Sequence, residues 1–205
     1  MAVADGLGGH AAGDVASATA IDALRQYDRA VEPDQLAGNL GHAVSDINAA
    51  LRRQTTANPA LARMGTTLVA LAWSGSSAVV ANVGDSRVYL LRAGALAQVT
   101  EDHVYGSLVS AASSVPNLPE KLARFLDGRT DGRSPDLTPI ALKPGDRVLL
   151  CSDGLSSFVA HAVIENVLID RTSADEVVDR LVQLALDAGG PDNVTAIIVD
   201  VEDSP

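Results

Sequence analysis

Four aspartates stand at the ends of apolar runs, each beside a glycine or an asparagine: Asp5, Asp85, Asp153 and Asp192. A strand end projects a short carboxylate rigidly, and a neighbouring glycine lets the backbone come close to a bound group. Taken singly, each is an ordinary turn residue. Four carboxylates at one edge, however, repel one another unless they share protons or a cation. Because oxygen ligands suit hard ions, the pattern favours magnesium, manganese or calcium over zinc.

The elements that must position these aspartates begin with two helices and a set of short strands. Apolar residues at three-residue spacing predict a helix over residues 14–26, and a second apolar stripe follows Pro33, from Leu36 to Leu51. The period then changes, and strands are predicted at residues 67–72, 77–83, 87–91 and 95–99. The turn sequences at 74–76, 84–85 and 93–94 are too short for crossover helices, so the sheet is expected to be antiparallel.

The second half of the chain repeats this alternation. We predict a short helix over residues 118–126, a surface loop over 127–135, and strands at 137–142, 147–151 and 194–201. Ser173 and Glu176 form a capping-box pattern that starts a helix, and Gly189 and Gly190 end it. Strands with helices before and after them indicate an α+β fold, with helices packed outside antiparallel sheets.

The composition fits a single domain spanning residues 1–205 and excludes several functions. With 15 basic and 26 acidic side chains, the formal net charge of −11 argues against nucleic acid or acidic membranes as partners. No apolar run approaches the roughly 18 residues of a membrane-spanning helix, and the first residues do not read as a signal peptide. The single cysteine, Cys151, excludes an internal disulfide. We therefore expect a monomer in a reducing, cytoplasmic setting.

Five segments also carry a resemblance, in order along nearly the whole chain. They are residues 3–13 (VADGLGGHAAG), 64–67 (MGTT), 82–87 (NVGDSR), 145–155 (GDRVLLCSDGL) and 189–195 (GGPDNVT). Together they resemble the successive motifs of the metal-dependent protein phosphatases of type 2C, in their bacterial serine/threonine branch. One such motif would be weak evidence for the family, whereas five motifs in the family's order and spacing are specific to it.

The resemblance implies a four-layer α-β-β-α sandwich, two antiparallel sheets with helices outside, and a binuclear centre of Mg²⁺ or Mn²⁺. Asp5 would bridge both metals, and the Gly6 carbonyl would bind the second. Asp153 and Asp192 would hold the first metal, and Asp85 with Asp153 a third, weaker ion. Phosphorylated proteins, the products of serine/threonine kinases, would be the substrates. A water activated by the cations would attack phosphorus directly.

No side-chain nucleophile is needed for such a reaction, so Cys151 is interpreted as a small core residue. The family also carries about thirty residues before the Asp5 motif, and these include an arginine that grips phosphate. In this sequence only four residues precede Asp5. On that ground, the alternative function is a catalytically weak or inactive phosphatase-like binding module. The stand-ins considered for the phosphate-gripping arginine are Arg63, Arg87 and Arg129.

The general acid is not assigned by the sequence. Leu7 occupies the position of a histidine in eukaryotic relatives, and His10 and His103 are alternatives, although a lone histidine is more often structural. Residues 6–11 also match the G-x-G-x-x-A dinucleotide fingerprint, but that fold needs parallel strands where this chain predicts hairpins. Ser86, in a Gly-Asp-Ser sequence, resembles an esterase serine without the histidine that would serve as its base.

Overall fold

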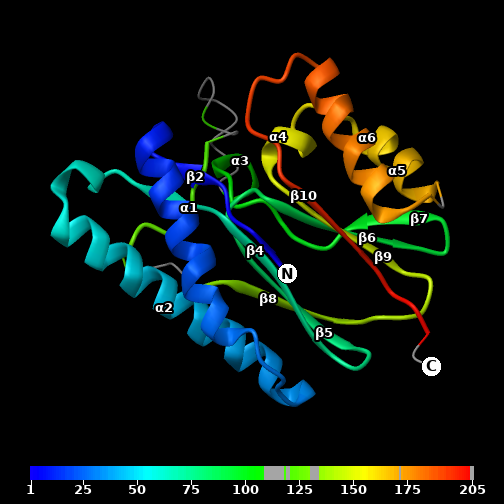
Figure 1. Cartoon of the computed structure of the whole chain (residues 1–205), viewed down its shortest axis with the longest axis horizontal. Helices are drawn as coiled ribbons and strands as arrows, with labels where there is room; N and C mark the ends of the chain where they lie inside the picture. The colour runs from blue at the N-terminus through cyan, green and yellow to red at the C-terminus, as the bar shows by residue number, and fades with distance from the viewer. Residues whose placement is uncertain (109–117, 119–120, 130–133, 171, 204–205) are drawn as a thin grey trace.

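Two β-sheets lie face to face, and helices cover the outer face of each (Figure 1). The computed structural model describes residues 1–108, 118, 121–129, 134–170 and 172–203. Among these residues, no helix is long and apolar enough to cross a membrane. This layered arrangement is the four-layer α-β-β-α sandwich expected from the sequence.

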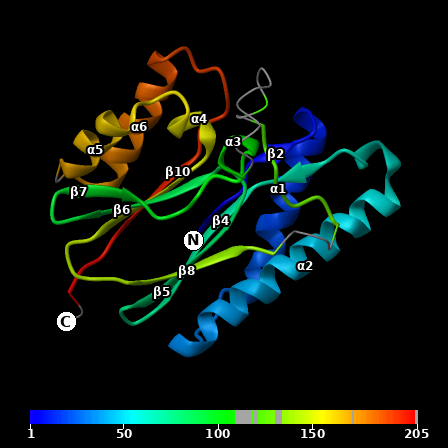
Figure 2. The ribbon, with the colours of Figure 1, turned by 180° about the vertical axis from the view of Figure 1, so that it is seen from behind.

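The helices fall into an early pair and a late group. The early pair is α1 (His10–Leu24) and α2 (Leu36–Ala57). The later helices are α3 (Tyr105–Leu108), α4 (Asp153–Ser156), α5 (His161–Ile169) and α6 (Ala174–Asp187). In Figure 2, seen from behind, α1 and α2 flank one sheet while α5 and α6 flank the other.

The strands form two four-stranded sheets and one small ribbon. The first sheet has the order β1 (Ala2–Val3), β4 (Leu68–Ser74), β5 (Ser77–Val83), β8 (Asp136–Ala141). The second has the order β10 (Ala196–Asp200), β9 (Arg147–Cys151), β6 (Arg87–Arg92), β7 (Ala95–Gln98). The ribbon pairs β2 (Gly6–Leu7) with β3 (Gly65–Thr66). Each pairing is antiparallel, as the short turns predicted.

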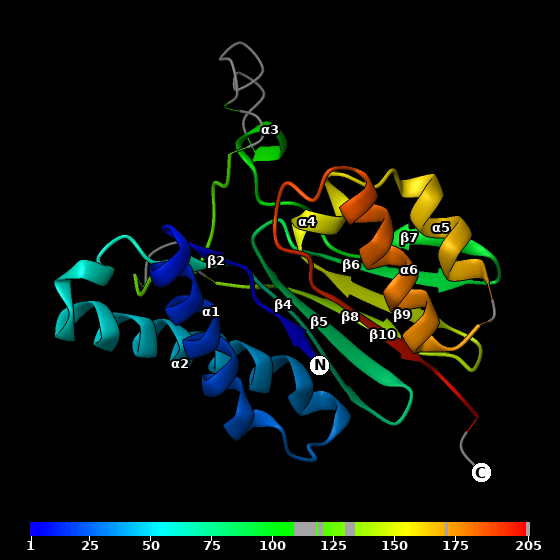
Figure 3. The ribbon, with the colours of Figure 1, turned by 45° about the horizontal axis from the view of Figure 1, so that its top comes forward.

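Alternation along the central strands explains the layers. In β4, Val69 and Leu71 pack between the sheets, whereas Leu68 packs against α1 and α2. In β9, Leu150 lies between the sheets, and Cys151 packs toward α5 and α6. Both sheets are thus buried on two faces, which is why their strands read as continuous apolar runs rather than as an alternating pattern. The tilted view of Figure 3 separates the two helical layers across the sheets.

Several local predictions are confirmed. Cys151 is fully buried in the core. The Ser173–Glu176 capping box is formed in both directions, with Glu176 N–H donating to Ser173 Oγ at 3.3 Å. The turn between β6 and β7 places Ala93 and Gly94 at φ of 52° and 82°, the left-handed pair that suits a two-residue hairpin.

Other local predictions are wrong or incomplete. The described residues 121–126 form no helix; Leu122 and Leu126 instead pair in isolated bridges with Val104 and Thr66. These long-range backbone bonds replace the local bonds of a helix. Helices α4 and α5 were not predicted from the sequence, and α1 begins four residues before the predicted start. In the predicted loop 127–135, the described residues 127–129 and 134–135 carry no helix or strand, and residues 130–133 lie outside the described part.

Candidate metal centre

The four candidate aspartates all follow elements that end at one edge of the sandwich. Asp5 lies between β1 and β2, and Asp85 lies in the turn from β5 to β6. Asp153 is the first residue of α4, two residues beyond β9, and Asp192 lies in the loop from α6 to β10. Figure 1 shows β2, α4 and the loop before β10 around the same end of the two sheets.

Asp5 and Asp153 form the centre of this group. Among the neighbouring carboxylates, Asp153 acts most strongly on Asp5, and the charges of Asp192 and Asp85 also act on it. Burial, followed by the hydrogen bond and charge of Asp153, raises the pKa of Asp5 to about 7. Burial, with the charge of Asp153 next, raises the pKa of Asp85 to about 6. The charges of the other three candidate aspartates thus all act on Asp5.

The donor set fits a hard divalent cation. Asp153 is half-buried, and its Oδ1 is fully enclosed without a hydrogen-bond partner, as expected of an oxygen shaped for a ligand. Carboxylate and carbonyl oxygens are the ligands that Mg²⁺ and Mn²⁺ prefer. Among the described residues, no group of three or more Asp, Glu, His or Cys side chains lies close enough together to hold a metal ion. The carboxylate of Asp153 acts on Asp5 more strongly than those of Asp192 and Asp85.

Close backbone packing sets the position of the segment that follows Asp5. A Cβ added at Gly6 would overlap the backbone of Gly13 in the first turns of α1, so only glycine fits. Likewise, a Cβ at Gly154 would overlap the Asn193 carbonyl, which brings the loop carrying Asp192 against the start of α4. These two glycines allow the ligand-bearing segments to meet.

Threonine and serine hydroxyls hold the turns that carry the carboxylates, a role that the sequence did not reveal. The Asp5 N–H donates to Thr67 Oγ1 at 3.1 Å, and the Asp5 carbonyl accepts from Thr67 N–H at 2.8 Å. Thr66 Oγ1 donates to the same carbonyl at 2.9 Å. Thr67 Oγ1 in turn lies 2.7 Å from Ser86 Oγ, beside Asp85.

Ser152 plays a comparable part for Asp192. Its Oγ accepts the Thr195 N–H at 3.1 Å and donates to the Asn193 carbonyl at 3.4 Å, and its own N–H donates to the Thr195 carbonyl at 3.0 Å. Asp192 itself is exposed and accepts the Asn193 N–H at 2.8 Å. Ser152 therefore ties the loop carrying Asp192 to the end of β9, next to Asp153.

Arg87 is a structural strut rather than a stand-in for a phosphate ligand. It forms a two-pronged ion pair with Asp102 and also donates to Tyr89 Oη at 3.0 Å and to the Ser156 carbonyl at 3.4 Å. Arg129, another stand-in, pairs with Asp127 at 2.5 Å. Arg63 is exposed on the segment before β3.

His103 is buried and structural, as the sequence-based expectation for a lone histidine indicated. Its Nδ1 accepts the Gly84 N–H at 3.0 Å, and its Nε2 lies 2.9 Å from Asp136 Oδ2. Burial lowers the pKa of His103, so the neutral ring is favoured. Both ring nitrogens of His103 are therefore engaged by protein groups. His10 begins α1, and its side chain lies outside the described part of the structure.

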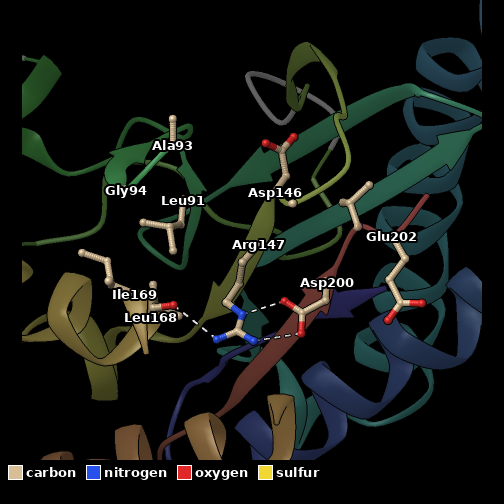
Figure 4. A pocket seen from close by; sticks show the side chains of 11 residues that line it. Leu91, Ala93, Gly94, Asp146, Arg147, Leu168, Ile169, Asp200 and Glu202 are labelled. Carbon is tan, nitrogen blue, oxygen red and sulfur yellow. Dashed lines mark hydrogen bonds and ion pairs between the residues drawn. The ribbon is translucent and has the colours of Figure 1, made fainter. Parts of the chain in front are cut away.

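A separate hollow of about 270 Å³ lies at the other end of the second sheet, beneath the turn at Ala93 and Gly94 (Figure 4). Arg147 crosses its floor and is bound by Asp200 and by the carbonyls of residues 168, 170 and 172. All five N–H groups of the Arg147 guanidinium are thereby engaged, so this side chain connects β9 to β10 and to the end of α5. None of the four candidate aspartates lines the hollow.

Comparison with known proteins agrees with this geometry. Residues 1–197 match the family described as protein phosphatase 2C. The chain is 41% identical over 99% of its length to the serine/threonine protein phosphatase PstP of Mycobacterium tuberculosis, but it spans only 40% of that protein. It is 36% identical to the serine/threonine phosphatase stp of Listeria welshimeri, covering 97% of this chain and 82% of that protein.

Solved structures give the same result. The catalytic domain of PstP in complex with two manganese ions superposes with a TM-score of 0.89 at 41% identity, covering 98% of this chain and 87% of that one. Stp1 of Staphylococcus aureus superposes with a TM-score of 0.87 at 31% identity, covering 98% of this chain and 83% of that one. The motif resemblance and the layered fold therefore have one explanation: this chain belongs to the protein phosphatase 2C family, in its bacterial serine/threonine branch.

Proposed function

We propose that this chain is a metal-dependent phosphatase domain that hydrolyses phosphoserine and phosphothreonine in proteins. The observation that carries the proposal is the Asp5–Asp153 carboxyl pair, with the buried, unpartnered Oδ1 of Asp153, at the sandwich edge of a protein phosphatase 2C member. The relatives are named as serine/threonine phosphatases, and one was solved with two manganese ions, which supports the same assignment here.

The aspartates divide the task of holding the cations. Asp5 would contact two Mn²⁺ or Mg²⁺ ions, with the Gly6 carbonyl on the second, and Asp153 and Asp192 would hold the first. Asp85, together with Asp153, would hold a third, weaker ion. When bound, such cations acidify a water for in-line attack on phosphorus and offset the charge that develops on the phosphoryl oxygens.

The protonation of Asp5 and of the Cys151 thiol also bears on the reaction. Asp5 must lose its proton to serve two cations, and burial followed by the neighbouring carboxylates raises its pKa, which disfavours that charge when no cation is bound. The thiol of Cys151 does not compete as a nucleophile, because burial raises its pKa to about 12 and the side chain is fully enclosed. Direct attack by water is therefore the reaction that fits these residues.

We extend the proposal to the setting of the protein. A single catalytic domain acting as a monomer in the cytoplasm, on proteins phosphorylated by serine/threonine kinases, fits a single buried cysteine and a surface with net charge −11. A phosphothreonine peptide flanked by basic residues is accordingly the first substrate to try.

The test is release of phosphate from that peptide with Mn²⁺ and with EDTA. We expect turnover with Mn²⁺, loss of turnover with EDTA, and loss of at least about 100-fold in kcat for Asp153→Asn, because several kcal/mol of charge stabilisation depend on the bound cations. Asp203→Asn, at the exposed last described residue, is the matched control and should retain turnover. Turnover that survives EDTA would refute the metal mechanism. Binding of the peptide without turnover in Mn²⁺ would favour the binding-module alternative.

A further inference from the structure

Thr67 contacts two of the turns that carry candidate ligands. It follows β3 directly, is 1% exposed, and exchanges two hydrogen bonds with the backbone of Asp5, one through its Oγ1 and one through its N–H. The Asp5 carbonyl is bound a second time by Thr66 Oγ1. The backbone of Asp5 is therefore held at both its N–H and its carbonyl, and the hydroxyl of Thr67 is part of that hold.

The same hydroxyl reaches the turn between β5 and β6. Thr67 Oγ1 and Ser86 Oγ lie 2.7 Å apart, and Ser86, the residue after Asp85, is fully buried. Between two buried hydroxyls, the hydrogen bond is formed whichever oxygen donates, and no water competes with it. One side chain thus bridges the segment of Asp5 to the segment of Asp85.

Backbone geometry brings this turn onto Thr67. Gly84 has a φ of 120°, and a Cβ added there would lie 2.6 Å from Thr67 Cβ and 2.7 Å from its Cγ2. Only glycine both adopts this φ without strain and leaves room for the threonine. The methyl of Thr67 therefore limits how closely the turn between β5 and β6 approaches. Its hydroxyl fixes the register of that turn.

We propose that Thr67 and Ser86 are positioning residues that set the placement of the Asp5 carboxylate relative to the Asp85 carboxylate, and so the affinity for divalent cations. This rests on the proposed function, in that both aspartates are taken as ligands. The carboxylates repel one another before cations arrive, so the force that keeps them converged must come from the backbone that carries them. A bridge between the two backbones supplies that force without adding charge to the site. Outer partners of this kind typically change metal affinity by about 10–100-fold when they are removed.

The test compares Thr67→Val, which keeps the shape and removes the hydroxyl, with Thr67→Ser, which keeps the hydroxyl. The readout is the dissociation constant for Mn²⁺ by titration calorimetry on the whole chain, in addition to kcat and KM. We expect Thr67→Val to weaken Mn²⁺ binding by about 10-fold or more and Thr67→Ser to restore it to within about threefold. Thr19→Val is the matched control, because its Oγ1 bonds only within α1, to the Val15 carbonyl at 2.6 Å.

A purely structural role for the hydroxyl predicts a different result. In that case Thr67→Val would lower the melting temperature of the metal-free protein but leave the Mn²⁺ dissociation constant unchanged, which would overturn the proposal. If Thr67→Val does not fold, Ser86→Ala removes the bridge while leaving the bond between Asp5 N–H and Thr67. It should weaken Mn²⁺ binding as well, and an unchanged constant for Ser86→Ala would refute the bridge.

This experiment separates the positioning role from the proposed activity. If the wild-type chain binds Mn²⁺ without turnover and Thr67→Val weakens that binding, the positioning role stands and the phosphatase activity fails. If the wild-type chain turns over substrate and Thr67→Val binds Mn²⁺ normally, the activity stands and the positioning role fails. A wild-type chain that binds no Mn²⁺ refutes both.

Discussion

The guanidinium of Arg87 and the carboxylate of Asp102 form a fork-to-fork ion pair, with Nε 2.9 Å from Oδ1 and Nη2 2.6 Å from Oδ2. The two side chains are only 25% and 17% exposed. Because Arg87 begins β6 and also binds the Ser156 carbonyl at the end of α4, the pair connects three segments around the candidate metal centre. Because Nε, Nη1 and Nη2 all bind protein groups, the geometry assigns this arginine a structural role.

Replacing Arg87 should therefore cost stability more than substrate affinity. For Arg87→Met we expect a loss of about 2–3 kcal/mol in the free energy of unfolding, because Asp102 loses its charged partner. KM for a phosphopeptide should change by less than about threefold, since no contact to substrate is lost. Urea unfolding and steady-state kinetics measure the two effects. A tenfold rise in KM at unchanged stability would contradict the assignment. Arg25→Met, in an exposed pair with Asp22, is the control and should cost under about 0.5 kcal/mol.

Replacing Asp153 should make the metal-free protein more stable and remove its stabilisation by Mn²⁺. Asp153→Asn removes the charge that helps to raise the pKa of Asp5, so the metal-free protein should melt a few degrees higher at pH 8, about 2–4 °C. The same variant should lose the stabilisation that Mn²⁺ gives the wild type, because a ligand charge is gone. Melting curves with EDTA and with Mn²⁺ measure both. A lower melting temperature in EDTA would show that the carboxylates do not repel one another there.

The effect of Mn²⁺ on stability should increase with pH. The pKa of Asp5 is raised to about 7 and that of Asp85 to about 6, so their protonated forms stabilise the metal-free fold. That contribution is complete below the unfolded-state value of about 4 and is lost as pH rises through 6 to 7. The increase in melting temperature on adding Mn²⁺ should therefore grow from pH 5 to pH 8.

Groups with lowered pKa values act in the opposite direction. Burial lowers the pKa of His103 and of the N-terminal amine, so their contribution to stability is lost as pH falls within this window, equally with EDTA and with Mn²⁺. Hydrogen bonds from Arg92 lower the pKa of Asp146, so the stability it contributes is lost only below about pH 4. Melting curves at pH 5, 6, 7 and 8 with EDTA and with Mn²⁺ therefore isolate the raised carboxyls. An Mn²⁺-dependent increase that is equal at pH 5 and pH 8 would contradict the raised pKa of Asp5.

Removing the Ser152 hydroxyl should loosen the loop that carries Asp192. Ser152→Ala leaves the Thr195 N–H without its acceptor, so we expect a loss of about 1–2 kcal/mol in stability and weaker Mn²⁺ binding. Ser173→Ala is a matched control, because loss of the N-cap of α6 costs a similar ~1 kcal/mol at the far end of that helix. Calorimetric titration with Mn²⁺ distinguishes them: equal dissociation constants for the two variants would rule out a role for Ser152 at Asp192.

Local sequence signals predicted much of the fold because they act over a few residues. The capping box at Ser173, the two left-handed residues at Ala93 and Gly94, and the short apolar runs each specify a conformation with their immediate neighbours. The same signals fail where pairing with a distant backbone segment determines the local conformation. Leu126 belongs to a run that reads as helical, yet it pairs with Thr66, which lies 60 positions earlier in the chain. A single sequence contains no record of that partner.

The candidate metal centre was likewise predicted only in part from the sequence. By itself, the sequence determined that Asp5, Asp85 and Asp153 follow strands, because an aspartate beside a glycine after an apolar run is recognisable within five or six residues. Only the tertiary structure decided that Thr67 and Ser86 join the turns of Asp5 and Asp85, that Arg87 is committed to Asp102, and that His103 is buried beneath Gly84. These contacts join residues 15 to 62 positions apart, and their roles depend on burial and on hydrogen-bond distance, which exist only once the two sheets have packed together.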